Sequence, residues 1–252
     1  MLINYHHFKI APWRLAFLLG GVFGIISFYL RKNLMETNEY LKLQQFIKQQ
    51  KITPLKELFT SHKKDLFQIT ALGSLFASSF AVFSFFIPSY LANYYNFPLD
   101  KILKYNSYSI ILFIIASFIA GKYYYFFGKK FLLSSIMLFI PISFYLFFNY
   151  SHLSLDQIIY LHYLLLFFIG LLCGRLPVLL ASFFPVYVRY SGVALAYNIS
   201  FGIVAGLTQV ILFSLIKISG IMWLPAVYLT IFAIIALAFI ITIPARKFVE
   251  YQ

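Results

Sequence analysis

The sequence predicts an all-α, polytopic membrane protein with about seven transmembrane helices, and two observations carry that prediction. The first is composition: 62% of the 252 residues are hydrophobic and only 11% are charged, whereas soluble domains are about a quarter charged. The second is that the apolar residues gather in long runs, and a helix needs about 20 apolar residues to span a bilayer core. A single water-soluble core cannot bury so much apolar surface, so the membrane class follows before any motif is considered.

Seven apolar runs mark the expected helices. They lie near residues 12–30, 66–92, 105–127, 131–150, 157–182, 190–216 and 221–244. Several contain Gly or Pro, such as Gly20, Pro88 and Pro141, which membrane helices tolerate because neighbouring helices satisfy the freed backbone groups. The expected organisation is an N-terminal segment with one span (1–31), a basic cytoplasmic loop (32–65) and a six-helix bundle (66–252).

The formal net charge is +13, from 20 Lys and Arg residues against 7 Asp and Glu residues. The basic residues lie mostly in loops, which favours a positive-inside orientation signal over a nucleic-acid partner. If the first run ends in the cytoplasm, 14 basic residues fall in cytoplasmic segments and five in outside segments. The sequence therefore predicts a multi-pass protein of the cell inner (plasma) membrane, with its N-terminus outside and its C-terminus in the cytoplasm.

The basic loop contains the stretch ITPLKELFTSHKKDLF. Its spacing predicts a short helix with Leu55, Leu58 and Phe59 on one face and lysines around it, lying at the cytoplasmic surface. Cys173 is the single cysteine, which excludes an intrachain disulfide and a thiolate metal site. The sequence has no metal-ligand spacing, phosphate loop or catalytic motif, so we expect no metal or cofactor and no enzyme activity.

Three stretches carry a family resemblance. WRLAFLLGGVFGIISFYLRKNLMET resembles the sixth helix of the metabolite:proton symporters of the major facilitator superfamily, a group that includes the proline/betaine transporters. FFIPSYLANYYNF resembles the family's seventh helix, and FFPVYVRYSGVALAYNISFGIVAG is similar to its F-P-x-x-V-R-[YF]-[ST]-G signature. The matching positions are Trp13, Arg14, Phe17, Gly20, Leu30, Arg31, Glu36 and Thr37, then Pro88, Tyr90 and Leu91, then Pro185, Val188, Arg189, Tyr190, Ser191, Gly192, Leu195, Tyr197 and Asn198.

The resemblance covers the whole chain but only the second half of the family. It implies that solute binds near the bilayer midplane, between two six-span halves that rock to alternate access. We therefore expect the C-terminal portion of a proton-coupled symporter for a small solute such as proline, betaine or an organic acid, active when a separate chain supplies the first five spans. A non-functional remnant of a split transporter gene and a membrane interaction or regulatory subunit are the alternatives.

The loop GKYYYFFGKK departs from the superfamily's gating-loop motif, G-x-x-x-D-R-x-G-R-[KR]. The residues that remain at its ends are Gly121, Gly128, Lys129 and Lys130. Tyr125 stands where the motif has Asp, and Ser182 stands where the family has Glu before its F-P. In the family the loop acid anchors charge pairs that latch the cytoplasmic gate, so these two losses favour the remnant interpretation.

Arg175 and His162 are charged or titratable residues within the runs, whereas all seven acidic residues fall in loops or at the terminus. Arg within a membrane costs at least about 2.5–3.5 kcal/mol on insertion scales, so Arg175 should face the bundle interior or a water-filled cavity. It either contacts an anionic group on the solute or bonds helix-end carbonyls. His162 is either a proton-linked residue or an interfacial side chain.

Four further polar residues, Tyr90, Tyr197, Asn198 and Gln209, lie on helices that line the central cavity in the family fold. A buried polar side chain needs a hydrogen-bond partner, and that partner is either the solute or a neighbouring helix. With Arg175, these four are the predicted solute contacts. The 20 tyrosines of the chain also fit an aromatic belt at the membrane surfaces.

Overall fold

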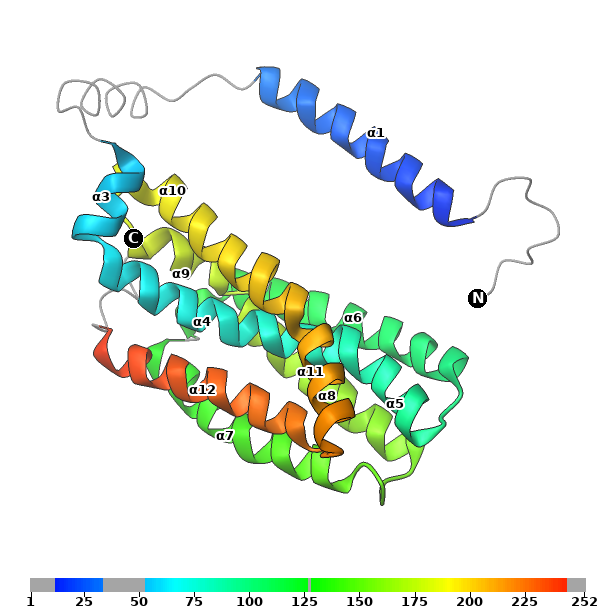
Figure 1. Ribbon diagram of the computed structural model, residues 1–252. Coiled ribbons are helices and arrows are strands. Elements are labelled where there is room, and N and C mark those ends of the chain that lie inside the picture. Colours follow the sequence, from blue (N-terminus) through cyan, green and yellow to red (C-terminus); the bar gives the residue numbers. More distant parts are fainter. Residues whose placement is uncertain (1–11, 34–52, 127, 244–252) are drawn as a thin grey trace. The chain divides into compact units, whose positions relative to one another are not determined.

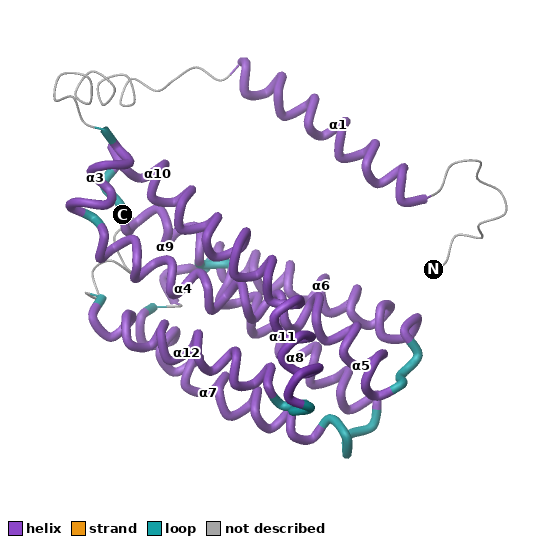
Figure 2. The backbone as a smooth tube through the Cα atoms, in the orientation of Figure 1, coloured by secondary structure: helices purple, strands orange, loops and turns teal. Residues whose placement is uncertain are grey.

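The computed structural model describes residues 12–33, 53–126 and 128–243, and the regular elements in these ranges are all helices (Figure 2). The chain divides into two compact units, Met1–Ile52 and Thr53–Gln252. In the first unit, helix α1 (Pro12–Asn33) coincides with the first predicted span. Its apolar stretch, Phe17–Leu30, is shorter than the spans of the second unit. The family-match residues Glu36 and Thr37 lie outside the described residues.

Within its described residues, the second unit has six helical spans that are long and apolar enough to cross a membrane (Figure 1). They are Lys63–Tyr95, Leu99–Lys122, Lys129–Asn149, Leu155–Phe183, Val186–Ser219 and Leu224–Thr242. Each coincides with one of the last six predicted runs, so the predicted all-α polytopic class is confirmed. The elements are α3 (Pro54–Ser61), α4 (Lys63–Ala81), η1 (Val82–Phe86), α5 (Ile87–Tyr95), α6 (Leu99–Lys122), η2 (Tyr124–Phe126), α7 (Lys129–Asn149), α8 (Leu155–Cys173), α9 (Leu176–Phe183), α10 (Val186–Tyr197), η3 (Asn198–Ala205), α11 (Gly206–Ser219) and α12 (Leu224–Thr242).

Prolines account for two interruptions in the spans. The π-helical segment η1 ends two residues before Pro88, which has no N–H and crowds the carbonyl of Ser84 within η1, so the helix widens there. The span Leu155–Phe183 breaks at Gly174 and Arg175, shortly before Pro177. A second π-helical segment, η3, joins α10 to α11.

The span Lys63–Tyr95 forms the centre of the bundle. In its most apolar window 83% of the residues are buried, against 22% in Val186–Ser219 and 17% in Leu99–Lys122. Its helix α4 contacts α8, α9, α10, η3 and α12, and Figure 1 shows α10 and α12 on either side of it. The spans containing α6 and α10 therefore each leave a broad face that no other described helix of this unit covers.

Glycines allow α6 and α8 to approach each other closely. A Cβ at Gly170 would lie 2.6 Å from the carbonyl oxygen of Phe113, and a Cβ at Gly174 would collide with the carbonyl oxygen of Ser117. The Ser117 hydroxyl donates a hydrogen bond to the Gly170 carbonyl oxygen at 3.1 Å. Two small residues four positions apart are the pattern that brings membrane helices into backbone contact.

The short helix predicted in the basic loop is present as α3. Its Leu58 is fully buried, in one cluster with Leu66 and Val188, so α3 packs onto the bundle at the start of α10. Leu55 and Phe59 were predicted on the same face, but each is 55% exposed. These two apolar side chains point away from the bundle, as expected for a helix at a membrane surface.

Candidate functional site

An open groove of about 550 Å³ runs along α10. Its polar lining comes from Arg189, Tyr190, Tyr197 and Asn198, and the other lining side chains are Ala and Val. Tyr190 is 88% exposed and Tyr197 is 50% exposed. The Tyr197 ring stacks on Phe201 with centroids 4.6 Å apart. The groove therefore brings together two of the predicted solute contacts, Tyr197 and Asn198.

The same span continues beyond the groove with two open glycines. A Cβ added to Gly202 or to Gly206 would meet nothing within 4 Å. Asn198, Gly202 and Gly206 are all exposed and Gln209 is half-buried. Asn198 and Gly202 lie in the π-helical segment η3, so their exposure, and not the α-helical period, shows that they lie on the open face. The spacing of the two glycines is visible in the sequence and indicates a helix-packing face, but the sequence analysis did not single it out.

Tyr90 lies in the bundle interior, away from the groove. Its side chain is fully buried, and its hydroxyl donates to the carbonyl oxygen of Met222 at 3.0 Å and lies 3.3 Å from the Tyr95 hydroxyl. The rings of Phe86 and Tyr150 pack against it, with centroids 5.1 and 5.9 Å away. Neighbouring helices therefore satisfy the Tyr90 hydroxyl, and its contact with solute stays a prediction.

Arg175 lies at the break between α8 and α9 and is only 1% exposed. Its Nη1 donates a hydrogen bond to the carbonyl oxygen of Tyr124 at 2.7 Å, just beyond the end of α6. Tyr124 begins η2, so the acceptor is a carbonyl of the connection after α6 and not one of the last carbonyls of α6 itself. Arg175 does not line the groove, and its contact with solute stays a prediction.

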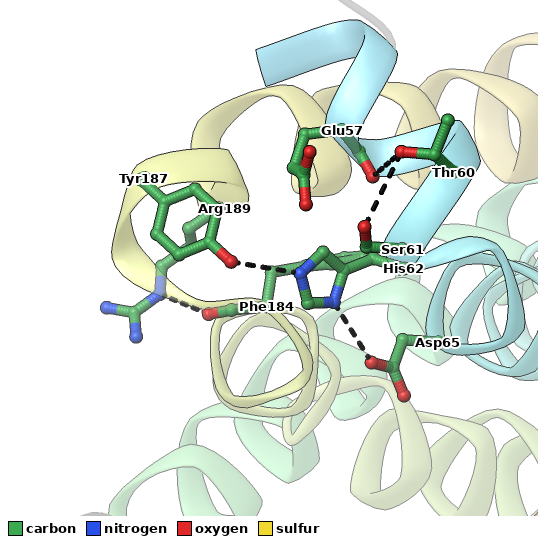
Figure 3. Close-up of polar contacts among 8 residues, drawn as sticks. All are labelled: Glu57, Thr60, Ser61, His62, Asp65, Phe184, Tyr187 and Arg189. Carbon is green, nitrogen blue, oxygen red and sulfur yellow. Dashed lines mark hydrogen bonds and ion pairs between the residues drawn. The ribbon is translucent and has the colours of Figure 1, made fainter. Parts of the chain in front are cut away.

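Three residues of the family signature, Pro185, Arg189 and Gly192, lie at or just after the turn between α9 and α10, and Figure 3 shows the bond of Arg189 to Phe184. Pro185 directly precedes α10 as its N-cap. Arg189 Nε donates to the carbonyl oxygen of Phe184 at 3.1 Å, which ties the first turns of α10 back to the chain before it. A Cβ at Gly192 would lie 2.7 Å from the Phe184 ring, so only glycine leaves room for that ring.

His62 connects the corner between α3 and α4 to the same turn (Figure 3). Its Nε2 lies 3.2 Å from the Tyr187 hydroxyl, and its Nδ1 lies 3.6 Å from Asp65 Oδ2. The sequence analysis singled out none of these three as a cluster, because they are brought together only by the packing of α3 and α4 onto α10.

The remaining gating-loop residues hold helix ends. Gly128 is the N-cap of α7. Lys129 Nζ donates to two carbonyl oxygens at the C-terminal end of α12, at 3.0 and 2.5 Å, where a cation is favoured by the helix dipole. Lys130 is exposed, and Gly121 lies in the last turn of α6. Lys129, the first residue of the basic pair, therefore links α7 to α12.

His162 is buried within α8 and is 7% exposed. Its Nε2 lies 3.3 Å from the side-chain oxygen of Asn106 on α6. Asn106 in turn donates to the carbonyl oxygen of Ser84 in η1 at 3.0 Å. The sequence analysis missed Asn106, although an Asn within an apolar run is a signal that it needs a partner inside the bundle.

These features define an α-helical, multi-pass membrane protein with an open groove along α10. Comparison with known proteins shows that the chain is similar to proline/betaine transporters and to a citrate-proton symporter. It is 29% identical over 259 residues to a glycine betaine/proline/ectoine/pipecolic acid transporter of Dickeya dadantii, covering 94% of this chain and 49% of the relative. It is also 29% identical over 241 residues to the proline/betaine transporter of Escherichia coli, covering 89% of this chain and 47% of the relative.

A citrate-proton symporter of Salmonella typhi is 28% identical over 215 residues, covering 82% of this chain and 48% of the relative. The chain thus spans about half the length of the curated relatives it matches. Neither a family model nor a solved structure gives a match. The relatives named here are transporters and symporters, which agrees with the expectation of a transporter and not an enzyme.

Proposed function

We propose that this chain forms the C-terminal half of a proton-coupled secondary transporter in the inner membrane, where a separate chain supplies the first five spans. The solute is a small zwitterion of the proline and betaine kind or an organic acid, as the names of the relatives suggest. The N-terminus lies outside and the C-terminus in the cytoplasm. The observation that carries the proposal is the open face of the span Val186–Ser219, which combines the groove with the two open glycines.

That face suits protein and water better than lipid. Asn198 and Gly202 lie near the middle of a 34-residue span. The Asn198 amide nitrogen donates to the Ala194 carbonyl oxygen of its own helix at 2.7 Å, and hydrocarbon would offer its amide oxygen no donor. The Gly202–Gly206 spacing lets a second helix approach the backbone closely. A complementary half seated here would cover the glycines and enclose the groove, which the chain by itself leaves open.

The proposal assigns roles to the polar residues of the bundle. Tyr197, Asn198 and Gln209 face the enclosed space and contact the solute; Tyr90 and Arg175, which also have partners within the bundle, complete the set of solute contacts. His162 binds the coupled proton. Lipid surrounds the outer helices.

Site-specific photo-cross-linking in the membranes of the source cell tests the complementary half. We would place a photo-reactive residue at position 198, facing the groove, and in a matched variant at position 234, an exposed isoleucine of α12. The proposal predicts that position 198 captures a polypeptide with five membrane spans and that position 234 captures lipid. Capture of an unrelated membrane protein at position 198 would favour the regulatory-subunit alternative.

Uptake of labelled proline, glycine betaine and citrate in cells that hold both chains then tests transport. Gly202→Leu fills the open face and should reduce uptake to background, whereas Ala238→Leu, a small-to-large change on the exposed side of α12, should leave it unchanged. Background uptake of all three solutes, with both chains present in the membrane, would refute the proposed function.

A further inference from the structure

The bundle contains a buried polar cluster that lies apart from the groove. It joins three different spans: Ser84 from η1, Asn106 from α6 and His162 from α8. Such clusters are rare within membranes, because each polar group must find a partner there. The cluster lies toward the end of the bundle where α5 meets α6 and where α8 begins (Figure 1), which the charge distribution predicts to be the outer end.

The backbone orients the amide of Asn106. Pro88 has no N–H, so it cannot donate to the Ser84 carbonyl four residues earlier in the helix. That carbonyl oxygen instead accepts a hydrogen bond from Asn106 Nδ2 at 3.0 Å. Because a carbonyl can only accept, the NH₂ group of Asn106 must point toward Ser84 and its Oδ1 away from it.

The oriented amide then determines the tautomer of His162. Asn106 Oδ1 lies 3.3 Å from His162 Nε2, and this oxygen can only accept, so Nε2 carries the hydrogen. In a neutral ring with the hydrogen on Nε2, the other nitrogen, Nδ1, keeps its basic lone pair. Nδ1 is buried and has no hydrogen-bond partner among the described residues.

A small cavity adjoins the ring. Its volume is about 20 Å³, which is room for about one water molecule. Its surface is almost entirely apolar, although His162, Asn106, Ser109 and Tyr105 are among the residues that line it. Tyr105 is the one other titratable group in this lining, and the lining contains no carboxylate or ammonium group; α5 contributes only apolar side chains. On the η1 side, the ring of Phe83 lies 6.1 Å from His162. The aspartates of the spans, Asp65, Asp100 and Asp156, all lie in first turns of helices.

We propose that Nδ1 of His162 is a buried proton-binding site, with Asn106 as the positioning residue. A proton delivered by water binds the lone pair of Nδ1 and converts the ring to an imidazolium, while Nε2–H continues to donate to Asn106 Oδ1. Release of the proton to water returns the neutral ring, and no other bond forms or breaks. Asn106 Oδ1 accepts a hydrogen bond from the charged ring, so the imidazolium is more stable than it would be without this bond. The link between this site and solute movement rests on the function proposed above.

Nitrogen-15 NMR of histidine-labelled protein in lipid nanodiscs detects the protonation state of each ring nitrogen directly and needs no transport activity. The His162→Gln variant identifies the His162 signals by their loss. We expect a neutral ring with hydrogen on Nε2 and none on Nδ1, and protonation of Nδ1 on acidification. Asn106→Leu should give a mixture of both tautomers, whereas Asn149→Leu, which removes an amide bonded only within α7, should leave the His162 signals unchanged.

Hydrogen on Nδ1 in the neutral ring, or an Nδ1 that stays unprotonated at the lowest pH at which the protein remains folded, would overturn the proposal. Failure of the proposed function shows itself differently, as background uptake in every variant including the wild type. In cells with uptake, His162→Gln should abolish the response of uptake to an imposed pH gradient. Asn149→Leu should retain that response.

Discussion

Gly174→Ala tests whether the close contact of α6 and α8 holds this bundle together. A Cβ at Gly174 would collide with the carbonyl oxygen of Ser117 and would lie 2.7 Å from its carbonyl carbon and Cα. Carbon atoms are in favourable contact at about 3.5–4.0 Å, so α6 would have to retreat by roughly 1 Å. Backbone atoms cannot rotate away as the tip of a side chain can, and the neighbouring contact at Gly170 would open as well.

The expected cost follows from two opposing terms. Overpacking a tight contact costs about 1–3 kcal/mol, and more where backbone must move. Gly174 is the C-cap of α8, so the gain of about 1 kcal/mol for Ala over Gly in a helix interior applies there only in part. We expect a net loss of about 2 kcal/mol in the free energy of unfolding, a change of roughly 30-fold in the ratio of folded to unfolded protein. For a unit of this size that corresponds to a melting temperature about 4–8 °C lower.

The single cysteine, Cys173, provides the assay because it lies between the two glycines of the contact. The purified chain is heated in detergent with a thiol-reactive fluorophore. The reaction of Cys173 with this fluorophore reports the temperature at which α8 becomes accessible. Gly206→Ala is the matched control, since its new Cβ would meet nothing within 4 Å and only the helix-propensity gain remains. Equal melting temperatures for Gly174→Ala and Gly206→Ala would refute the reasoning.

Three further changes have defined outcomes. Gly192→Ala should lower the melting temperature, because the added Cβ would lie 2.7 Å from the Phe184 ring; an unchanged value would mean that the ring shifts freely. Tyr90→Phe removes a hydroxyl with two hydrogen-bond partners and should cost about 1 kcal/mol in the free energy of unfolding, measured in the same assay against the wild type. Arg175→Gln removes the guanidinium bond to the loop after α6 and should speed trypsin cleavage of that loop at Lys122, followed by peptide mass spectrometry; an unaltered cleavage rate would contradict an anchoring role.

The positions of the six spans could be predicted because they depend on local properties of the chain. A run such as 131–150 is apolar over its whole length, and its helix, Lys129–Asn149, appears within two residues of the predicted bounds. A helix satisfies its own backbone hydrogen bonds, so length and hydropathy suffice to place it. The π-helical segments were not predicted, because Pro88 alone does not show how the helix before it adjusts.

The candidate residues fared unevenly for the same reason. Tyr197 and Asn198 were singled out by resemblance and do lie together in a groove. Tyr90 was singled out by resemblance and Arg175 as a charged residue within an apolar run, but each has a partner far along the chain, Met222 and Tyr124 respectively. No spacing within one helix could reveal such partners, since they depend on which helices pack together.

The sequence by itself determined the membrane class, the helical spans and the family resemblance, because each depends on composition, run length or a contiguous motif. Tertiary structure alone decided which polar side chains satisfy one another and which face an open surface. Asn106 shows the difference: in the sequence it is one polar residue in an apolar run, and in the bundle it links the carbonyl freed by Pro88 to the ring of His162. Pairing between helices is a non-local property, and within a membrane the need to satisfy every buried polar group makes that pairing decisive.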